Sequence, residues 1–561
     1  MLEKKNLELL GDLKQRIINA KSRFSVVIFF LFISYFLITI KIFTLSINKT
    51  KEKSDAFYKQ NKIIQGFRAD IVDRNGVLLA TTIIKDDLVI NPRKIREDRK
   101  DKLAKEIYKI LPELNYESLI SKIKSKKSFV YLKRSISPKK YNAIMKIGEP
   151  NIFSIKRYVR YYPHQEHGSH IIGAVNIDNE GIKGIERTFD KNLKNLDFAK
   201  NDKVQLSIDI NLQKILDDHL SQTIEKHSAE GGVGIILDVK SSEILAMNSL
   251  PQFNPNKIEK MNKISEFNKA TLGIFELGSL LKPLTAAMAL DKNILNENTI
   301  YDARKPLIEG RFTIHDYKPK KRKLKFSECI LFSSNICFAQ VGNDVGEKNM
   351  KEYYEKMKLT TKPKIEIPET ADSMIPSIWR KTNLMTMSYG HGIAISPLQY
   401  VNAFNSVING GYFKYSTLLK NNSYEDELST KVVSESTSKR LRKLLREVVR
   451  NKEGSGDNAE IEGYHIGGKT GTAIKNKENR YIKNENITSF VGFFPSYDPR
   501  FIVFIMVDNP KPIKETFYYA TGGTVAAPTV KKIINEMIPK LRVEPEINKE
   551  NDVLQQVNLI N

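Results

Sequence analysis

The chain has 561 residues, which is too long for a single compact core, so the sequence predicts more than one folded unit. Its 41% hydrophobic and 28% charged residues are ordinary for folded proteins and exclude general disorder. The net charge of +25 suits nucleic acid, anionic lipid or an anionic wall polymer, but the basic residues are scattered without a zinc-finger or RNP-like pattern, which disfavours nucleic acid.

The first predicted element is a membrane anchor. An uncharged apolar run over residues 24–40 resumes after Lys41 through Ile47, and crossing a bilayer takes about 20 residues. Positive charge stays in the cytoplasm, so the basic leader, residues 1–23, is expected inside and the rest outside. A cleaved signal peptide is disfavoured because no small-residue cleavage site follows the run. We therefore expect one uncleaved transmembrane helix over residues 24–47.

A mixed α+β domain is expected next, over residues 48–203. Residues 48–65 are polar and predict a stalk. Asn75-Gly76 then lies between two alternating apolar runs, which is a strong hairpin signal. Short strands and amphipathic helices are expected from there to about residue 200.

The pattern changes near residue 204, where the second domain is predicted to begin. Leu212–His227 has the periodicity of an amphipathic helix. The predicted strands are residues 234–247 (two strands joined by a turn), 465–474, 488–494 and 501–507, with helices and loops between. A strand pair, a helical middle and three late strands predict one antiparallel sheet flanked by helices. This domain is expected over residues 204–540, before a polar tail, 541–561.

The two cysteines, Cys329 and Cys337, are predicted to lie on one helix. Eight residues of helix would separate them by about 12 Å, at 1.5 Å per residue, which exceeds disulfide reach. We therefore expect two free thiols packed as small hydrophobic side chains.

Three short motifs occur in order in the second domain: Ser279-Leu280-Leu281-Lys282, Ser333-Ser334-Asn335, and Lys469-Thr470-Gly471 extended by Thr472. Each alone is weak, and a helix cap, a turn and a solvated strand lysine would explain them separately. Their order and local setting make the set specific for serine acyl transfer. Gly454-Ser455-Gly456, shortly before the third motif, is interpreted as a loop tip.

The first motif predicts an activated nucleophile. Pro283 is tolerated only in a first helical turn, so Ser279 is expected at a helix N-terminus, with Lys282 one turn along the same face. A serine hydroxyl needs a base, and Lys282 serves only when it is neutral. Burial and a second ammonium, that of Lys469, would both lower the pKa of Lys282.

The third motif predicts a strand that receives substrate. Glycines flank Lys469 and allow another backbone to approach closely, which suits an edge strand pairing with a peptide. The hydroxyls of Thr470 and Thr472 can hold a carboxylate. The N–H groups of Thr472 and Ser279 are expected to form an oxyanion hole.

With these motifs the chain resembles the class B penicillin-binding proteins, from the anchor to about residue 540. Further matching segments are Arg68–Gly76, Arg160–Pro163 with His170, Gly181–Glu186, Ser207–Asp209, Asn254–Asn256, Tyr389–Gly392, Gly522-Gly523 and Ala526–Pro528. Lys-Thr-Gly-Thr at the third motif favours the cell-division branch of this family. Leu277 stands where the family usually has proline, and Leu280 replaces a usual threonine or methionine.

The resemblance implies a penicillin-recognising α/β serine transpeptidase domain, preceded by an α+β pedestal domain and one N-terminal transmembrane helix. Ser279 would attack the D-Ala-D-Ala carbonyl of a stem peptide and Lys282 would take the serine proton. Ser333 would relay a proton, Asn335 would bind a substrate amide, and Lys469, with Thr470, Gly471 and Thr472, would anchor the carboxylate end.

The same resemblance implies partners and location. The expected ligands are peptidoglycan stem peptides, lipid-linked glycan and β-lactams, which would acylate Ser279. A membrane glycan polymerase and other division proteins are expected partners, and no metal, organic cofactor or nucleic acid is implied. The protein is expected in the bacterial inner membrane, with its catalytic domain outside the cytoplasm.

Several alternatives remain beside this interpretation. A D,D-carboxypeptidase uses the same residues with water as acceptor, and a division scaffold or β-lactam sensor would not need the intact motifs. A class A β-lactamase needs a deacylating glutamate, and no Glu-x-x-Leu-Asn lies between Ser279 and Lys469. Less favoured are a metal site and a Ser-His-Asp triad built from histidines: His164, His167 and His170 for the metal, His315, His391 and His465 for the triad.

Overall fold

The computed structural model describes residue 23 and residues 25–44, 67–195, 202–310, 312–420, 429–477 and 480–545. The chain divides into two units, Met1–Gly66 and Phe67–Asn561. In the first, a 20-residue helix, Ser25–Thr44, has a mean hydropathy of 2.5 and is long and apolar enough to cross a membrane. The predicted stalk and residues 546–561 of the predicted tail lie outside the described residues.

The pedestal begins with the hairpin that the sequence predicted. Strand β1 (Ile71–Val72) pairs antiparallel with β2 (Leu78–Ile90), and Gly76 makes the turn at φ +85°. Strand β2 also pairs with β3 (Val130–Ile136) and β4 (Ile152–Tyr161). Helices α2 (Glu97–Ile110), α3 (Tyr116–Lys124) and α4 (Pro138–Met145) contribute to a hydrophobic cluster with these strands.

A buried ion-pair network joins the matched pedestal segments. Arg68 donates to Glu186 at 2.6 Å and to Asp190 at 2.6 Å, and Arg160 donates to the other oxygen of Glu186 at 2.6 Å. The side chains of Arg68, Arg160 and Glu186 are fully buried. The remaining short elements of this region are α5 (Ser169–Ile172), β5 (Ala174–Val175), β6 (Gly181–Lys183), α6 (Gly184–Thr188), α7 (Asp190–Lys194) and β7 (Val204–Gln205).

The second domain is built on the predicted antiparallel sheet, which has the order β16-β17-β18-β8-β9. Its strands are β8 (Gly231–Asp238), β9 (Ile244–Leu250), β16 (Gly467–Lys477), β17 (Arg480–Phe494) and β18 (Phe501–Asp508). The early pair joins the late trio through β18, where Phe501 pairs with Asp238 and Asp508 pairs with Gly231. This confirms that segments far apart in the sequence form one sheet, with β16 at its edge.

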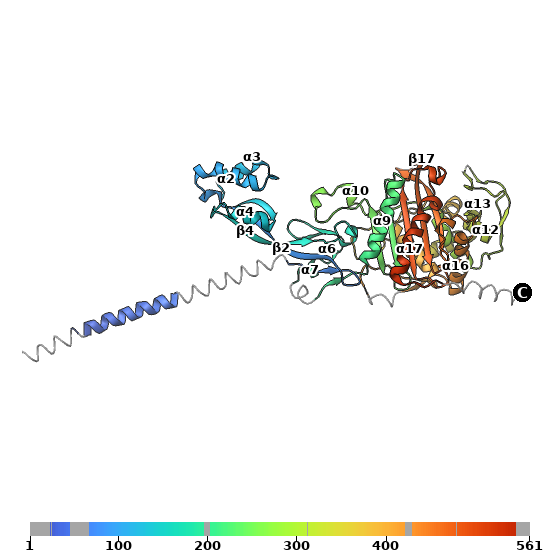
Figure 1. Ribbon diagram of the computed structural model, residues 1–561. Helices are drawn as coiled ribbons and strands as arrows, with labels where there is room; N and C mark the ends of the chain where they lie inside the picture. The colour runs from blue at the N-terminus through green and yellow to red at the C-terminus, as the bar shows by residue number, and fades with distance from the viewer. Residues whose placement is uncertain are drawn as a thin grey trace, which may run out of the picture. The chain divides into compact units, whose positions relative to one another are not determined.

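Helices cover both faces of this sheet. Helix α9 (Ile210–Lys226) begins at Asp209, whose side chain accepts from the N–H groups of Asn211 and Leu212. It packs with α17 (Ala527–Leu541) in one hydrophobic cluster, and Figure 1 shows these helices, green and red, side by side against the strands. A larger cluster on the other face holds the helical segments inserted between β9 and β16.

The inserted region contains both long helices and small hairpins. Its helices are α10 (Lys263–Glu266), α11 (Lys282–Asp291), α12 (Phe326–Leu331), α13 (Asn335–Lys356), α14 (Lys381–Met387), α15 (Pro397–Ile408) and α16 (Glu435–Arg450). Its strands are β10 (Ile300–Asp302), β11 (Leu307–Glu309), β12 (Phe312–Ile314), β13 (Lys323–Lys325), β14 (Tyr412–Phe413) and β15 (Thr430–Lys431).

The prediction of two free thiols is wrong. Cys329 and Cys337 form a disulfide, with their Cα atoms 5.9 Å apart. They do not lie on one helix, because α12 ends at Leu331 and α13 begins at Asn335. The chain reverses between them at Ser333, whose φ is +56°, and this turn brings the two cysteines within disulfide reach.

Candidate active site

Ser279 lies in a tight turn directly before a buried helix. The 3-10 turn Gly278–Leu281 continues into α11, so Lys282 is the first α-helical residue and Pro283 follows it without a steric conflict. Gly278 has φ +54° and donates its N–H to the carbonyl of Gly390 at 3.2 Å. Within this turn Leu280 and Leu281 are buried, while Ser279 is half-buried. The hydroxyl therefore remains accessible on a rigid support.

The amine of Lys282 joins the first two motifs. Its Nζ lies 3.0 Å from Ser279 Oγ and 3.1 Å from Ser333 Oγ. It also donates to the carbonyl oxygen of Ser333 at 2.6 Å and to Asn335 Oδ1 at 2.8 Å. The whole lysine side chain is inaccessible to solvent.

These contacts suit a neutral amine. A carbonyl oxygen and an amide oxygen only accept hydrogen bonds, so Ser333 and Asn335 use the two N–H groups that neutral Lys282 has. Its lone pair then remains for the hydroxyl of Ser279. Burial, followed by the charge of Lys469, holds the pKa of Lys282 well below its usual value, which are the two causes expected from the sequence.

Lys469, on the edge strand β16, contacts the hydroxyl of Ser333. Its Nζ donates to Ser333 Oγ at 2.9 Å and to the carbonyl oxygen of Thr470 at 3.1 Å. Burial lowers the pKa of Lys469 to about 7. The structure thus brings together all five residues predicted to be catalytic: Ser279, Lys282, Ser333, Asn335 and Lys469.

The edge strand lies directly against the serine turn. A Cβ at Gly471 would be 2.7 Å from the carbonyl oxygen of Leu277, so only glycine permits this approach. A Cβ at Gly278 would likewise be 2.8 Å from the carbonyl oxygen of Thr472. The two predicted oxyanion-hole donors, the N–H groups of Ser279 and Thr472, therefore belong to adjacent backbone segments.

The threonine hydroxyls of the third motif have different partners. Thr472 Oγ1 accepts from the N–H of Gly522 at 3.0 Å, which leaves its own proton for a ligand. Thr470 Oγ1 donates to Ser455 Oγ at 2.8 Å. Ser455 lies in a turn after α16, as the loop prediction requires, but it is half-buried and contacts the third motif, which the sequence did not predict.

Two further carboxylates belong to the site and were missed in the sequence. Asp316 accepts from Ser334 Oγ at 2.8 Å and from the N–H of Ile336 at 2.9 Å. Glu276 accepts from the N–H of Gly392 at 3.1 Å and from the hydroxyl of Tyr481 at 3.0 Å. The contacts of both carboxylates join segments that are distant in sequence, so no local sequence pattern predicts them. The position of Glu276 three residues before Ser279 was the only available signal.

The alternative histidine sites do not assemble in the described part of the chain. The hydrogen-bond partner of Ser279 Oγ there is Lys282 rather than an imidazole. His167 binds Asp217 at 2.6 Å, whereas His170 binds the carbonyl oxygen of Ser265 at 2.9 Å. No cluster of three or more potential metal-binding side chains occurs within the described residues.

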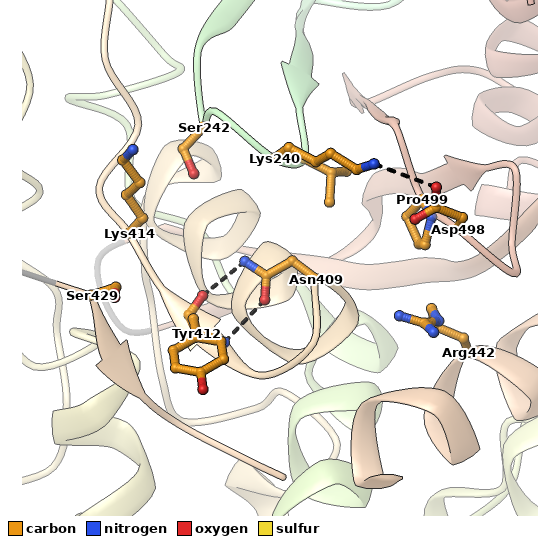
Figure 2. Close-up of a pocket in the computed structure, with 10 residues that line it drawn as sticks. Lys240, Ser242, Asn409, Tyr412, Lys414, Ser429, Arg442, Asp498 and Pro499 are labelled. Atoms are coloured by element: carbon orange, nitrogen blue, oxygen red, sulfur yellow. Dashed lines mark hydrogen bonds and ion pairs between the residues drawn. The ribbon is translucent and has the colours of Figure 1, made fainter. Parts of the chain in front are cut away.

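A cavity of about 350 Å³ lies apart from the three motifs (Figure 2). Lys240 and Asp498 form an ion pair of 3.4 Å at its wall, and Asn409 exchanges two hydrogen bonds with the backbone of Tyr412. Its lining residues are Val239, Lys240, Ser242, Asn409, Tyr412, Lys414, Ser429, Arg442, Asp498 and Pro499. None of them belongs to a motif, so the serine cluster remains the candidate site.

Two family models match the chain. The penicillin-binding protein transpeptidase domain matches residues 232–535, and the penicillin-binding protein dimerisation domain matches residues 63–207. The first covers the sheet, apart from Gly231 at the start of β8, and all three motifs, and the second covers the pedestal. Both matched ranges lie largely within the single compact unit Phe67–Asn561.

Similar proteins match over most of their length. A probable peptidoglycan D,D-transpeptidase FtsI of Caulobacter vibrioides is 32% identical over 489 residues, which cover 86% of this chain and 82% of that protein. The stage V sporulation protein D of Bacillus subtilis is 29% identical, with 88% and 81% covered. The peptidoglycan D,D-transpeptidase FtsI of Buchnera aphidicola subsp. Baizongia pistaciae is 29% identical, with 94% and 96% covered.

Proposed function

The chain belongs to the penicillin-binding-protein transpeptidase family, class B, and on this premise we propose that it cross-links peptidoglycan as a serine D,D-transpeptidase of septal wall synthesis. The names of the FtsI relatives support the septal assignment. The observation that carries the proposal is the buried Lys282 amine, 3.0 Å from Ser279 Oγ.

In the first half-reaction, neutral Lys282 takes the proton from Ser279 Oγ as this oxygen attacks the penultimate D-alanine carbonyl. The N–H groups of Ser279 and Thr472 stabilise the negative charge that develops on the carbonyl oxygen. The bond to the terminal D-alanine then breaks, and its amine leaves with the proton held by Lys282, relayed through the hydroxyl of Ser333. The product is an ester between Ser279 and the stem peptide.

In the second half-reaction, the amine of a neighbouring stem peptide attacks this ester. Its surplus proton passes to Lys282, and the serine oxygen leaves and regains a proton from that lysine. Electrons and protons balance without any external oxidant or reductant. Water in place of the amine would give the carboxypeptidase reaction at the same residues.

The edge strand β16 supports substrate binding. Its outer edge is free to pair with an extended stem peptide, within the described sheet. The hydroxyl proton of Thr472 and the amine of Lys469 provide the groups that would hold the terminal carboxylate. Asn335, which already holds Lys282 through its oxygen, would bind a substrate amide.

The membrane arrangement forms part of the proposal. Residues 1–23 would lie in the cytoplasm, 24–47 would span the inner membrane, and 48–203, 204–540 and 541–561 would be the pedestal, catalytic domain and tail outside. The basic leader supports this orientation: Lys4, Lys5, Lys14, Arg16, Lys21 and Arg23. Lipid-linked glycan, a membrane glycan polymerase contacting the anchor and other division proteins are the proposed partners.

The decisive experiment is labelling of the full chain with a fluorescent penicillin, followed by peptide mapping. The label is expected on the peptide that contains Ser279, and Ser279→Ala should abolish it. A covalent label on another peptide would refute the site assignment. Product analysis with paired stem peptides separates cross-linking from trimming, since only a transpeptidase yields the dimeric peptide.

A scaffold role makes a different prediction in cells. Ser279→Ala should fail to support septation when it replaces the native chain at equal abundance. If this variant supports growth and septation, the protein acts through binding alone and the enzymatic proposal is wrong.

A further inference from the structure

We infer that Asp316 is a positioning residue for the acyl-transfer site, which holds Ser333 and Asn335 against Lys282 and sets the pH at which Lys282 activates Ser279. This inference rests on the proposed function. Asp316 lies in the loop after β12, outside the three motifs.

Asp316 fixes the backbone that follows Ser333. Its two carboxylate oxygens separately accept from Ser334 Oγ at 2.8 Å and from the N–H of Ile336 at 2.9 Å. The neighbouring carbonyl of His315 accepts from Asn335 Nδ2 at 3.0 Å. Three consecutive residues of the second motif and α13 are thereby held by one dipeptide.

This restraint acts where the backbone is strained. Ser333 has φ +56°, a left-handed conformation that L-residues rarely adopt. The same residue must present both its carbonyl oxygen, at 2.6 Å, and its hydroxyl, at 3.1 Å, to Lys282 Nζ. A relaxed turn would withdraw one of these groups. The Asp316 contacts on the next residues oppose that relaxation.

The charge of Asp316 also acts on the base. The ionisable groups coupled electrostatically to Lys282 are Lys469 from β16, His391 from the segment after α14, and Asp316. Lys469 lowers the pKa of Lys282, whereas Asp316 raises it. Asp316 is the one acid in this set, so it opposes both burial and the neighbouring amine.

The direction of the expected effect follows from this arrangement. A negative charge favours the protonated form of Lys282, which cannot accept the serine proton. Removing the charge lowers the pKa of Lys282 further, so the neutral amine forms at lower pH. The rising limb of the acylation rate against pH should therefore move to lower pH.

The test measures the rate at which a fluorescent penicillin acylates the full chain, from about pH 5 to about pH 9. This is roughly the range in which a buried lysine titrates. Asp316→Asn retains the size of the side chain and should move the midpoint of the rising limb down by about one pH unit. Asp316→Glu retains the charge and should leave the midpoint near that of the native chain, even where its plateau rate is lower. Asp316→Ser serves the same test if Asp316→Asn does not fold.

Two controls separate charge from geometry. Ser334→Ala removes a contact of Asp316 but keeps its charge, so it should lower the plateau rate without moving the midpoint. Glu328→Gln neutralises a carboxylate that accepts from the N–H of Lys325 at 2.9 Å at the start of α12, and should change neither quantity.

The measured midpoints separate an effect of the Asp316 charge on Lys282 from a purely structural role of Asp316. Midpoints that are identical in the native chain and in the uncharged variant at position 316 would show that Asp316 only caps α13, and the inference would be wrong. Absence of any labelling in the native chain would instead refute the proposed function itself.

Discussion

Lys282 and Lys469 are both fully buried and present their amine nitrogens to one hydroxyl, that of Ser333, at 3.1 Å and 2.9 Å. Two positive charges beside one buried hydroxyl repel each other, so protonation of one amine disfavours protonation of the other. Because the two amines come from α11 and β16, their coupling exists only in the assembled fold.

Replacing Lys469 by alanine should therefore move the rising limb of the acylation rate to higher pH. The ammonium of Lys469 lowers the pKa of Lys282, and its removal lets that pKa rise. This direction is opposite to that expected for Asp316→Asn. Penicillin labelling rates across the pH range provide the measurement. A limb that stays in place would show that the two lysines titrate independently.

Gly390 should tolerate no side chain. It has φ +89°, and a Cβ there would overlap the carbonyl of Gly278, directly before the nucleophile. Gly390→Ala should displace the serine turn and reduce acylation at least tenfold, because small misplacements of catalytic groups are costly. Gly410→Ala is the matched control, since Gly410 has φ +101° but nothing within 4 Å of the added Cβ. Equal losses in both variants would assign the effect to backbone strain alone.

The Cys329–Cys337 disulfide should stabilise the fold around Ser333. It closes a loop with a sequence separation of 8, and loops of this size contribute roughly 2–3 kcal/mol to the free energy of unfolding. The double substitution C329S/C337S should lower the thermal midpoint of the full chain by a few degrees. Both sulfur positions are buried, so mild reduction of the folded protein should leave labelling unchanged. Rapid loss of labelling under mild reductant would contradict this.

Glu186 should be essential to the pedestal. It is fully buried between Arg68 and Arg160, so Glu186→Gln removes the carboxylate that Arg160 contacts and leaves Arg68 with Asp190 alone. Breaking such a network costs about 3–5 kcal/mol. The exposed pair of Lys351 and Glu347 provides the comparison, and Glu347→Gln should cost below about 0.5 kcal/mol. Thermal unfolding of both variants gives the measurement, and similar midpoints would contradict the argument.

The sequence predicted those parts of the fold whose signals are local. The Asn75-Gly76 hairpin, helix α9 and the five strands of the large sheet follow from turn chemistry and periodicity, and the structure contains them. Strand β17 is longer than expected because it pairs with an extended β16 well beyond the third motif.

The missed features depend on contacts between distant segments. The disulfide could not be predicted from helical spacing, since the break at Ser333 depends on a positive φ that periodicity does not reveal. Asp316 carries no motif, and its contacts at Ser334 and Ile336 are known only from the fold. Ser455 lies in a turn between two glycines, as predicted, but its contact with Thr470 joins segments that the sequence does not place together.

The order of strands in the large sheet has a consequence for biosynthesis. During synthesis β8 is made before the helical insertion and β18 after it. The edge of β8 that pairs with β18 therefore has no partner strand until β18 has been made. A nascent chain that has emerged only as far as residue 460 already carries the nucleophile but has neither Lys469 nor the strand that receives the peptide. A chain of that length should therefore react with neither substrate nor antibiotic, and reactivity should begin only when the last strands have joined the sheet.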